Sequence, residues 1–552
     1  MIRSQLKKVL EACFNDGVTE GLWSDKAAGK FTVELPKHEG QGDFSTNFAL
    51  VLAGIEKKNP REIAGQISEK LSKITELVER VEVAGPGFVN VFITPQVWRN
   101  LIPTIIDTGR EFGKSAVGAN RKVMVEFVSA NPTGPLSIGH GRQAILGDSI
   151  ARLLEATGHD VFREYYYNDA GRQMRVLGES TRARYLELIG ADFQFPEDGY
   201  QGEYIIDIAK SLVEEHGENL KDHEDVTPFK KQAEKFIFND ISGTLTRMGI
   251  EFDNYYNEQS LYEDGHIDDV VRALRDKGLV YEKDDATWFK TTELGQEQDR
   301  VIIKSSGEPT YRLPDIAYHR EKFRRDFDWL IDVFGSDHIA TVPDVLSGVK
   351  ALGYDPEKVT VVLHQFVTLT RDGKQVKMST RKANFVTVDE LLDEVGVDPV
   401  RFFFMMRKAD SQLEFDLDLA TKQSQENPVY YVQYGYARLC AIMRQAEEKG
   451  VAVPAFTEID STLLLEPEEL KLLKMMSGFP QVLETSALDL APHKIIFYLM
   501  ELAGQLHSYY NKHKVLTENE PLSKARLCLI RALQVVLKNG LDMVGLSAPD
   551  RM

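Results

Sequence analysis

The sequence predicts an α/β protein whose central part is a doubly wound parallel sheet, preceded by an α+β region and followed by an all-α bundle. Three observations predict it. Short apolar strand-like runs alternate with helical patterns from about residue 113 to 422. A glycine- and proline-rich junction joins one of these runs directly to a helix. After about residue 423 the strand-like runs end, and long amphipathic patterns continue to Met552.

Length, charge and cysteine usage limit the class of protein. A chain of 552 residues is too long for one core, so several domains are expected, and no apolar run approaches the ~20 residues of a membrane span. The three cysteines, Cys13, Cys440 and Cys528, form no CxxC pair. We therefore expect no protein-bound zinc, no disulfide framework and a cytoplasmic location. A net charge of −19 disfavours indiscriminate nucleic-acid binding, but it leaves room for a local basic groove.

We expect three domains, at residues 1–112, 113–422 and 423–552. In the first, a strand-like pair over Val81–Ile93 turns at Gly85-Pro86-Gly87. The second carries four strand-like runs, "KVMVEFV", "DVFREYYY", "DWLIDVF" and "KVTVVLHQFVTL". Roughly 175–300 is more charged and more helical, and is predicted to be an insertion. The third domain is predicted to be helical throughout.

The first candidate site is the stretch "VEFVSANPTGPLSIGHGRQAILGDSI", from Val125 to Ile150. It runs from a strand through a loop into a helix that Gly158 ends, and free backbone N–H groups at such a junction suit a phosphate. Within Ser137-Ile138-Gly139-His140, Gly139 permits close approach of the backbone and His140 could donate to a phosphate oxygen. An ordinary helix cap is the plain alternative.

The second candidate is "RDGKQVKMSTRKAN", Arg371 to Asn384, in which five cations are opposed only by Asp372. A solvated hairpin with Asp372-Gly373 at its turn is one interpretation. A clamp on a polyphosphate is the other, with the charge of Lys377 and the hydroxyl of Ser379 reaching the phosphates.

Together, a HIGH-like junction and a KMS segment more than 200 residues later resemble the class I aminoacyl-tRNA synthetases, whose catalytic domain is Rossmann-like. The stretches "YYYNDAGRQM", "GEPTYRLPDIAYHREKF", "VKMSTRKANFVTVDELLDEVGVDPVRFFF" and "ENPVYYVQYGYAR" are similar to the arginyl-tRNA synthetase family, as are "QGDFSTNFAL" and "GPGFVNVFI" near the N-terminus. Two positions depart from the pattern. Ser137 stands where the family usually has histidine, and Thr380 where many class I enzymes have a second lysine. A serine weakens one phosphate contact, and Lys377 or Lys382 would supply the missing charge.

The resemblance implies an ATP site. Besides Gly139, His140 and the segment with Lys377, Met378, Ser379 and Lys382, it includes "VFGSDH", where Gly335, Asp337 and His338 follow a strand. Ligands of doubly wound sheets lie beyond the carboxyl ends of the strands. A structural turn is the alternative there. His364 and Gln365 are weaker candidates for the adenosine side.

The resemblance also implies an arginine pocket. Asp315 would pair with the guanidinium group through two parallel hydrogen bonds, with Tyr311 four residues earlier on the same helix face. Glu126 and Asn131 match the family's acidic and amide positions ahead of the signature. A helix cap is the alternative for Asp315, and an internal salt bridge for Glu126, since a buried carboxylate needs a cation.

For tRNA, the helix that opens the third domain offers Tyr430, Tyr434 and Arg438 at a spacing of four, with Gln433 beside them. Unstacked bases stack on aromatic rings and bond to amides, although tyrosines at this spacing also occur in cores. The first domain is expected to touch the tRNA elbow.

The implied function is that of an arginine–tRNA ligase. L-Arginine and ATP give arginyl-adenylate, with Mg²⁺ on the phosphates, and the terminal ribose of tRNA(Arg) then takes the arginyl group. Members of the family generally bind tRNA before activation and are usually monomers. Two alternatives stay open. A nucleotidylyltransferase would share the HIGH-like junction but rarely the helical third domain, and a catalytically silent RNA-binding relative is suggested only by Ser137.

Overall fold

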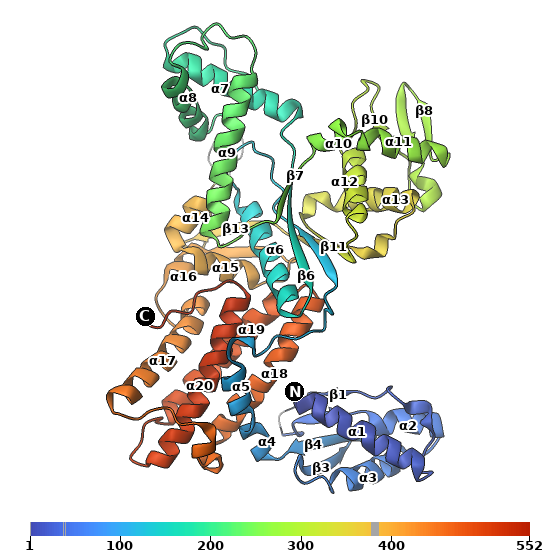
Figure 1. The fold of residues 1–552 in the computed structure, drawn as a ribbon, viewed down its shortest axis with the longest axis vertical. Helices are drawn as coiled ribbons and strands as arrows, with labels where there is room; N and C mark the ends of the chain where they lie inside the picture. Colours follow the sequence, from blue (N-terminus) through green and yellow to red (C-terminus); the bar gives the residue numbers. More distant parts are fainter. Residues whose placement is uncertain (1, 37, 39, 377–385) are drawn as a thin grey trace.

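The computed structural model describes residues 2–36, 38, 40–376 and 386–552 (Figure 1). The N-terminal region is a four-stranded antiparallel sheet of order β1-β2-β4-β3 with helices packed beside it. The predicted turn at Gly85-Pro86-Gly87 does join two antiparallel strands. The elements of this region are α1 (Ile2–Thr19), β1 (Val33–Glu34), β2 (Phe44–Thr46), α2 (Phe48–Glu56), α3 (Pro60–Leu71), β3 (Val78–Ala84) and β4 (Phe88–Ile93).

Five strands form the central sheet in the order β12-β11-β5-β6-β7, and every neighbouring pair is parallel. The predicted doubly wound parallel sheet is confirmed. Its strands are β5 (Lys122–Glu126), β6 (Asp160–Tyr167), β7 (Asn254–Asn257), β11 (Trp329–Gly335) and β12 (Val359–His364). The helix α6 (Ile138–Ala156) follows β5 and packs on the sheet, and α12 (Arg312–Arg324) precedes β11. Because β5 lies in the middle, the loop after it opens where the strand order reverses.

The segment predicted to be a helical insertion, roughly 175–300, contains both helices and strands. Its first part is helical, in α7 (Gly171–Leu188), α8 (Glu203–His216) and α9 (Thr227–Arg247). The chain then returns to the central sheet as β7. The strand was missed because Asn-Tyr-Tyr-Asn is short, polar at both ends and at the edge of the sheet, so it shows no alternation. The remaining elements are α10 (Gln259–Glu263), α11 (His266–Asp276) and a small antiparallel sheet of β8 (Val280–Lys283), β9 (Ala286–Phe289) and β10 (Arg300–Ile303).

After β11 the chain forms α13 (Val342–Leu352), β12, and a hairpin of β13 (Val367–Arg371) and β14 (Lys374–Gln375). Asp372 and Gly373 have φ of 51° and 68°, the values that a type I′ turn needs. The predicted hairpin is therefore present, directly before the segment that begins at residue 377. Beyond that segment lie α14 (Val388–Val395), α15 (Val397–Met405), β15 (Leu413–Asp416), which pairs with β13, and α16 (Leu417–Thr421).

The C-terminal region is a bundle of four long helices, as predicted: α17 (Pro428–Glu448), α18 (Pro467–Leu488), α19 (His493–Lys512) and α20 (Glu520–Met543). Figure 1 shows the bundle in orange and red below the central sheet, with the blue N-terminal region beside it. The linker helices α4 (Pro95–Arg99) and α5 (Leu101–Thr108) join the two, and Arg99 donates two hydrogen bonds to the carbonyl of Leu464.

One buried arginine joins the bundle to the helices of the central sheet. Arg401 of α15 donates to the carbonyls of Val544 and Met248 at 2.9 Å each, and it pairs with Asp148 on α6. The helix that follows β5 is thus tied to both the insertion and the end of the bundle. Among the described residues, no helix combines the length and apolar character that a membrane span requires.

Candidate functional site

The candidate site begins with a strained turn directly after β5. Val128 and Ser129 have φ of 68° and 43°, in the left-handed region that a β-branched residue such as valine rarely adopts. Each such residue costs on the order of 1–3 kcal/mol, so packing must hold it in place. Ser129 Oγ donates to Glu126 Oε1 at 2.9 Å and accepts from the backbone N–H of Tyr166 at 3.2 Å. The turn thereby fixes the end of β5 against its neighbour β6.

The HIGH-like junction is the capped start of α6. Ser137 is the N-cap, since its Oγ accepts from the backbone N–H of His140 at 3.4 Å. The ring of His140 returns the contact, because its Nδ1 accepts from the N–H of Ser137 at 3.3 Å. The helix therefore starts one turn earlier than the predicted apolar pattern, which begins at Gly141.

This cap assigns the proton of His140. Burial lowers the pKa of His140 and so favours its neutral ring, and the Asp337 carboxylate only partly opposes this. With Nδ1 accepting from Ser137, the proton of the neutral ring lies on Nε2, which becomes a hydrogen-bond donor. Among the described residues, a Cβ on Gly139 would meet only Ser137 Oγ, at 3.7 Å, so packing within this part of the chain does not demand glycine there.

The chain that follows the KMS segment returns to this junction. Ser137 forms an antiparallel bridge with Thr387, and the N–H of Val388 donates to the carbonyl of Leu136 at 2.9 Å. A Cβ on Gly141 would lie 2.7 Å from Val388 Cγ2, so glycine is needed there for close approach. Four residues predicted to contact ATP, namely Lys377, Met378, Ser379 and Lys382, lie outside the described residues. The described residues that follow this segment are hydrogen-bonded to the HIGH-like junction.

The carboxyl ends of β11 and β12 form the other side of the site. Gly335 and His364 are paired in register there, and the rings of Phe334 and His338 stack with centroids 5.2 Å apart. The side chains of Asp337 and His338 are exposed. Burial lowers the pKa of His364 to about 4, helped by the nearby Arg142, and its Nε2 has no hydrogen-bond partner among the described residues. Because His140 and Asp337 also influence His364, these groups share one edge of the sheet.

The residues predicted to bind the substrate arginine lie on α12, at the end of β5 and in the loop after β5. Asp315 is in the first turn of α12, and no described residue donates a hydrogen bond to its carboxylate. Burial raises its pKa to about 7, the carboxylates of Glu258 and Glu126 add to this, and His319 opposes it. Tyr311 is the N-cap residue of the same helix and its side chain is 84% exposed. The two residues thus lie on one helix, although only Asp315 is partly enclosed.

Glu126 has the internal cation that was one of its two interpretations. Lys322 of α12, fully buried, pairs with Glu126 and, at 2.6 Å, with Asp332 of β11. Burial raises the pKa of Glu126 against the influence of Lys322. Asn131 is held close by, where its Oδ1 accepts from the N–H of Asn168 at 2.9 Å.

Glu258 is an acidic residue of this pocket that the sequence did not reveal. It follows β7, and its carboxylate accepts from Tyr166 Oη and Asn168 Nδ2 at 2.7 Å each. Burial raises its pKa. The signal that could have found it is the position of Glu258 after a parallel strand, but that strand itself was not predicted.

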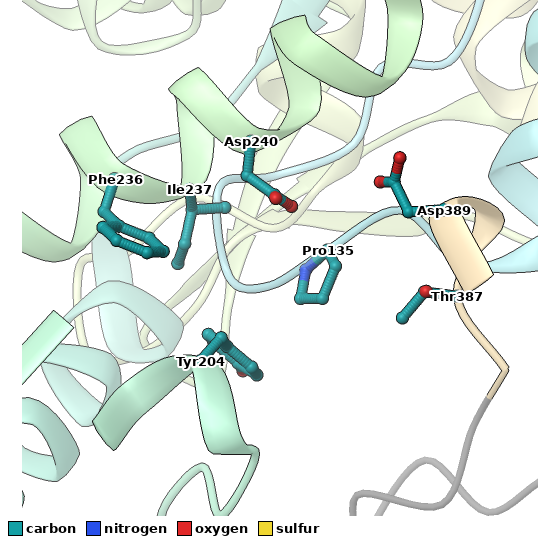
Figure 2. A pocket seen from close by; sticks show the side chains of 7 residues that line it. All are labelled: Pro135, Tyr204, Phe236, Ile237, Asp240, Thr387 and Asp389. Atoms are coloured by element: carbon teal, nitrogen blue, oxygen red, sulfur yellow. The ribbon is translucent and has the colours of Figure 1, made fainter. Parts of the chain in front are cut away.

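A separate cavity of about 190 Å³ lies beside the junction (Figure 2). Figure 2 shows two carboxylates in its wall, Asp240 from α9 and Asp389 from α14. Burial raises the pKa of Asp240, and Asp389 adds to it. An apolar cavity with two carboxylates repels phosphate, so it does not suit a nucleotide. Its lining residues are Pro135, Tyr204, Phe236, Ile237, Asp240, Thr387 and Asp389.

The residues predicted to bind tRNA lie along α17. The rings of Tyr430 and Tyr434 stack with centroids 5.9 Å apart, and the Arg438 guanidinium lies 4.7 Å from the centre of Tyr434 and 4.5 Å from that of Tyr510 on α19. Arg438 Nη1 also lies 2.8 Å from His507 Nδ1. These rings and the guanidinium form a continuous half-exposed row across two helices.

Gln433 does not belong to this row. Its side chain is buried. Its amide nitrogen, Nε2, donates to Asp398 Oδ2 at 2.7 Å and to the carbonyl and hydroxyl oxygens of Ser547. The amide therefore joins the bundle to α15 and to the C-terminal tail.

Three family models match consecutive parts of the chain. "Arginyl tRNA synthetase N terminal domain" matches residues 1–93, "tRNA synthetases class I (R), catalytic domain" residues 101–410, and "DALR anticodon binding domain" residues 432–552. The second alone covers more than half of the chain. The chain belongs to the class I arginyl-tRNA synthetases.

Relatives of this synthetase match it from end to end. The arginine–tRNA ligase of Desulfotalea psychrophila is 76% identical over 555 residues, covering 100% of both chains, and that of Syntrophotalea carbinolica is 48% identical, covering 100% of this chain and 99% of its own. The solved arginyl-tRNA synthetase of Thermus thermophilus has the same fold, with a TM-score of 0.75 at 22% identity over 100% of each chain. The predicted activity, arginine–tRNA ligase, is confirmed, and the two alternatives to it are set aside.

Proposed function

We propose that this synthetase binds ATP across the carboxyl edge of β11 and β12 and arginine beside it, between α12 and the end of β5. The supporting observation is the convergence of three segments at one edge: the capped start of α6, the ends of β11 and β12, and the chain that returns at Thr387. Ligands of doubly wound sheets occupy this position. In the family's reaction, the arginine carboxylate attacks the α-phosphate of ATP and releases pyrophosphate. The terminal ribose of tRNA(Arg) then takes the arginyl group and releases AMP.

The phosphates of ATP would lie at the start of α6. Nε2–H of the neutral His140 would donate to a phosphate oxygen whose charge grows in the transition state, and Gly139 would let the backbone approach. Gly335, Asp337 and His338 would meet the adenosine. Lys377, Met378, Ser379 and Lys382 would complete the site from the KMS segment. Ser137, the N-cap, would act by orienting His140.

Mg²⁺ is expected on the phosphate oxygens, where it would neutralise charge on the leaving pyrophosphate. The donor set fits this arrangement. Among the described residues, the one cluster of His, Cys, Asp and Glu side chains close enough to share an ion is Glu466, Glu468 and His513, in the helical bundle. The strand edge itself would therefore leave the ion to the phosphates and water.

Arginine would bind with its guanidinium group at Asp315 and its ammonium group near Glu126 and Asn131. Burial raises the pKa of Asp315 to about 7, so its charged form is disfavoured before the substrate binds. A bound guanidinium group would stabilise that charged form, and the carboxylate would in turn bind the guanidinium group. Glu258 lies close enough to influence Asp315 and would add negative potential. Tyr311, exposed at the start of α12, would cover the substrate from the open side.

The tRNA would lie on the row of Tyr430, Tyr434 and Arg438, where an unstacked base finds ring faces and a cation. We assign Gln433 the task of holding the row in place. We retain the division into residues 1–112, 113–422 and 423–552, with the first domain at the tRNA elbow. We also propose a cytoplasmic location, which the three unpaired and buried cysteines support, and a monomer, the usual form of the family.

Arginine-dependent exchange of pyrophosphate into ATP, measured with and without tRNA(Arg), tests these assignments. We expect exchange only when both arginine and tRNA are present. His140→Ala should lower the rate by on the order of 10²-fold, the effect of one lost transition-state donor. Gly139→Ala should lower it too, whereas Asp240→Asn, in the separate cavity, should leave it unchanged. A full rate in His140→Ala, or a loss in Asp240→Asn, would place ATP elsewhere.

A further inference from the structure

An exposed aromatic ring with two cations beside it lies at the rim of the proposed ATP site. Phe366 follows β12 by two residues, and its side chain is 65% exposed. Arg407 and Lys408, after α15, are exposed, and neither side chain has an ion-pair or hydrogen-bond partner within the part of the chain that the structure describes. We call these three side chains the aromatic rim.

Backbone hydrogen bonds hold the two segments of the aromatic rim together. The N–H of Gln365 donates to the carbonyl of Ala409 at 2.9 Å, and the N–H of Leu413 donates to that of Phe366 at 3.3 Å. The rim is therefore a small two-segment platform, not two separate loops.

A buried arginine on α6 clamps the same platform from below. Arg142 is fully buried, and its guanidinium donates to the carbonyls of Gln365 at 2.6 Å, Lys408 at 3.0 Å and Ser411 at 3.0 Å. Arg142 lies two residues after His140, so the helix that carries the proposed phosphate donor also sets the position of the aromatic rim. The ring of Phe366 is thus exposed on a fixed backbone next to the proposed ATP site.

The aromatic rim is close to the place where the reaction must end. Phe366 is two residues beyond His364, so their Cα atoms lie within about 7.6 Å. His364 is paired with Gly335, at which ATP is proposed to bind. The second step needs the terminal ribose of tRNA at the adenylate, so the unpaired nucleotides just before it must cross the protein surface close to this edge.

We propose that the aromatic rim binds the unpaired 3′ end of tRNA, with a base stacked on Phe366 and phosphates at Arg407 and Lys408. The inference rests on the proposed position of ATP. An exposed ring beside unpaired cations fits single-stranded nucleic acid, since any base offers a face for stacking and the backbone offers charge. The exposed Asp410 follows Lys408 by two residues but does not pair with either cation. Arg407 and Lys408 therefore still give this stretch a net positive charge, on a chain of net charge −19, and favour phosphate there.

The test compares tRNA(Arg) that is complete with tRNA(Arg) lacking its unpaired 3′ nucleotides. Dissociation constants are measured for the wild type, Phe366→Ala, Phe366→Trp and the control Phe88→Ala, an exposed phenylalanine of the N-terminal region. We expect Phe366→Ala to weaken binding of complete tRNA by about 5- to 150-fold, the range for one lost base stack, and to leave truncated tRNA unaffected. Phe366→Trp, which keeps an aromatic ring at this position, should bind complete tRNA about as tightly as the wild type. Any effect of Phe88→Ala should be equal for the two RNAs.

Salt dependence tests the two cations. In the double variant Arg407→Gln/Lys408→Gln, the slope of log K against log salt for complete tRNA should flatten by about 1.4, since each single-strand phosphate contact contributes about 0.7. If the variants weaken both RNAs equally, the surface binds the paired stem and the proposal is wrong. It is equally wrong if neither RNA is affected. The affinity for ATP is measured in parallel. If the proposed ATP site is correct, His140→Ala weakens ATP binding and the variants of the aromatic rim do not. A failure of the tRNA proposal can therefore be told apart from a failure of the proposed ATP site.

Discussion

Lys322 Nζ lies 2.6 Å from Asp332 Oδ1, and the lysine side chain is completely buried. Asp332 is one of three carboxylates that lie side by side across the sheet, since β5 places Glu126 in register with Asp332 on one side and with Glu164 on the other. All three are buried, and α12 supplies their cations. Lys322 serves Glu126 and Asp332, and Arg325, just after the helix, makes two bonds of 2.6 Å to Glu164. The helix that carries Asp315 is therefore positioned by charge against the sheet.

The first prediction concerns this pairing. Although burial acts to raise the pKa of Asp332, Lys322 and His319 hold it below its usual value. Lys322→Met would leave two buried carboxylates without their cation, which costs about 3–5 kcal/mol. We expect that loss in the free energy of unfolding, measured by urea denaturation. The triple variant with Asp332→Asn and Glu126→Gln removes the unpaired charges and should recover much of the loss. A single variant within 1 kcal/mol of the wild type would mean that the pairing contributes nothing.

The second prediction is the pH dependence of arginine binding. Burial raises the pKa of Asp315 to about 7, so the carboxyl group is increasingly protonated as the pH falls below 7 and can no longer accept two hydrogen bonds from a guanidinium. The KM for arginine should therefore be constant above about pH 8 and rise by up to tenfold per pH unit below pH 7.

The control for this profile is Asp315→Asn, which has no proton to lose at this position. We expect its KM for arginine to be raised at every pH and to be nearly independent of pH, and Asp315→Ala should abolish the use of arginine. The KM for ATP should show no such step in either protein. A wild-type profile that is flat between pH 6 and 8 would remove Asp315 from the guanidinium site.

The sequence could predict the elements with strong periodicity and the residues that belong to a local motif. The strand ending at Glu126, the signature junction and the Asp372-Gly373 hairpin all depend on neighbours in the chain, so local patterns reveal them. Lys322 lies in the charged run His-Arg-Glu-Lys-Phe, which is typical of a solvated helix face. Only the register of the sheet shows that this lysine is buried between two carboxylates.

Residues that distant segments bring together could not be predicted from the sequence, because local patterns do not show which segments are neighbours in the fold. Glu258 reaches the proposed arginine pocket through β7, whose four residues show no alternation. Gln433 directly precedes Tyr434 in the sequence, but successive helix residues are rotated by 100°, and Gln433 faces Asp398 and the C-terminal tail. Spacing identified the row on α17, and only packing separated its exposed members from the buried one.

The third prediction concerns Ser137, which replaces the family's usual histidine. Because its hydroxyl caps α6, Ser137→Ala should lower the free energy of unfolding by about 0.5–2 kcal/mol, and Ser137→Asp should keep most of the stability. Thermal and urea unfolding measure this. In pyrophosphate exchange, Ser137→His tests the phosphate contact. A rise in rate would show that the serine limits activation, and an unchanged rate would show that the cap compensates.

The last prediction separates recognition by the bundle from recognition at the reaction centre. Arg438 lies between the rings of Tyr434 and Tyr510, so its loss removes both a cation and the support of the row. Arg438→Gln should raise the KM for tRNA(Arg) by on the order of tenfold, because base stacking on such a row is worth about 1–3 kcal/mol. Arg444→Gln is the matched control on the same helix, where the arginine donates to the carbonyl of Asp550 and lies outside the row. Since the row would bind RNA far from the reacting ribose, tRNA with and without its unpaired 3′ end should lose equal affinity in Arg438→Gln. A loss confined to complete tRNA would instead place the 3′ end, and not a base of another loop, on α17.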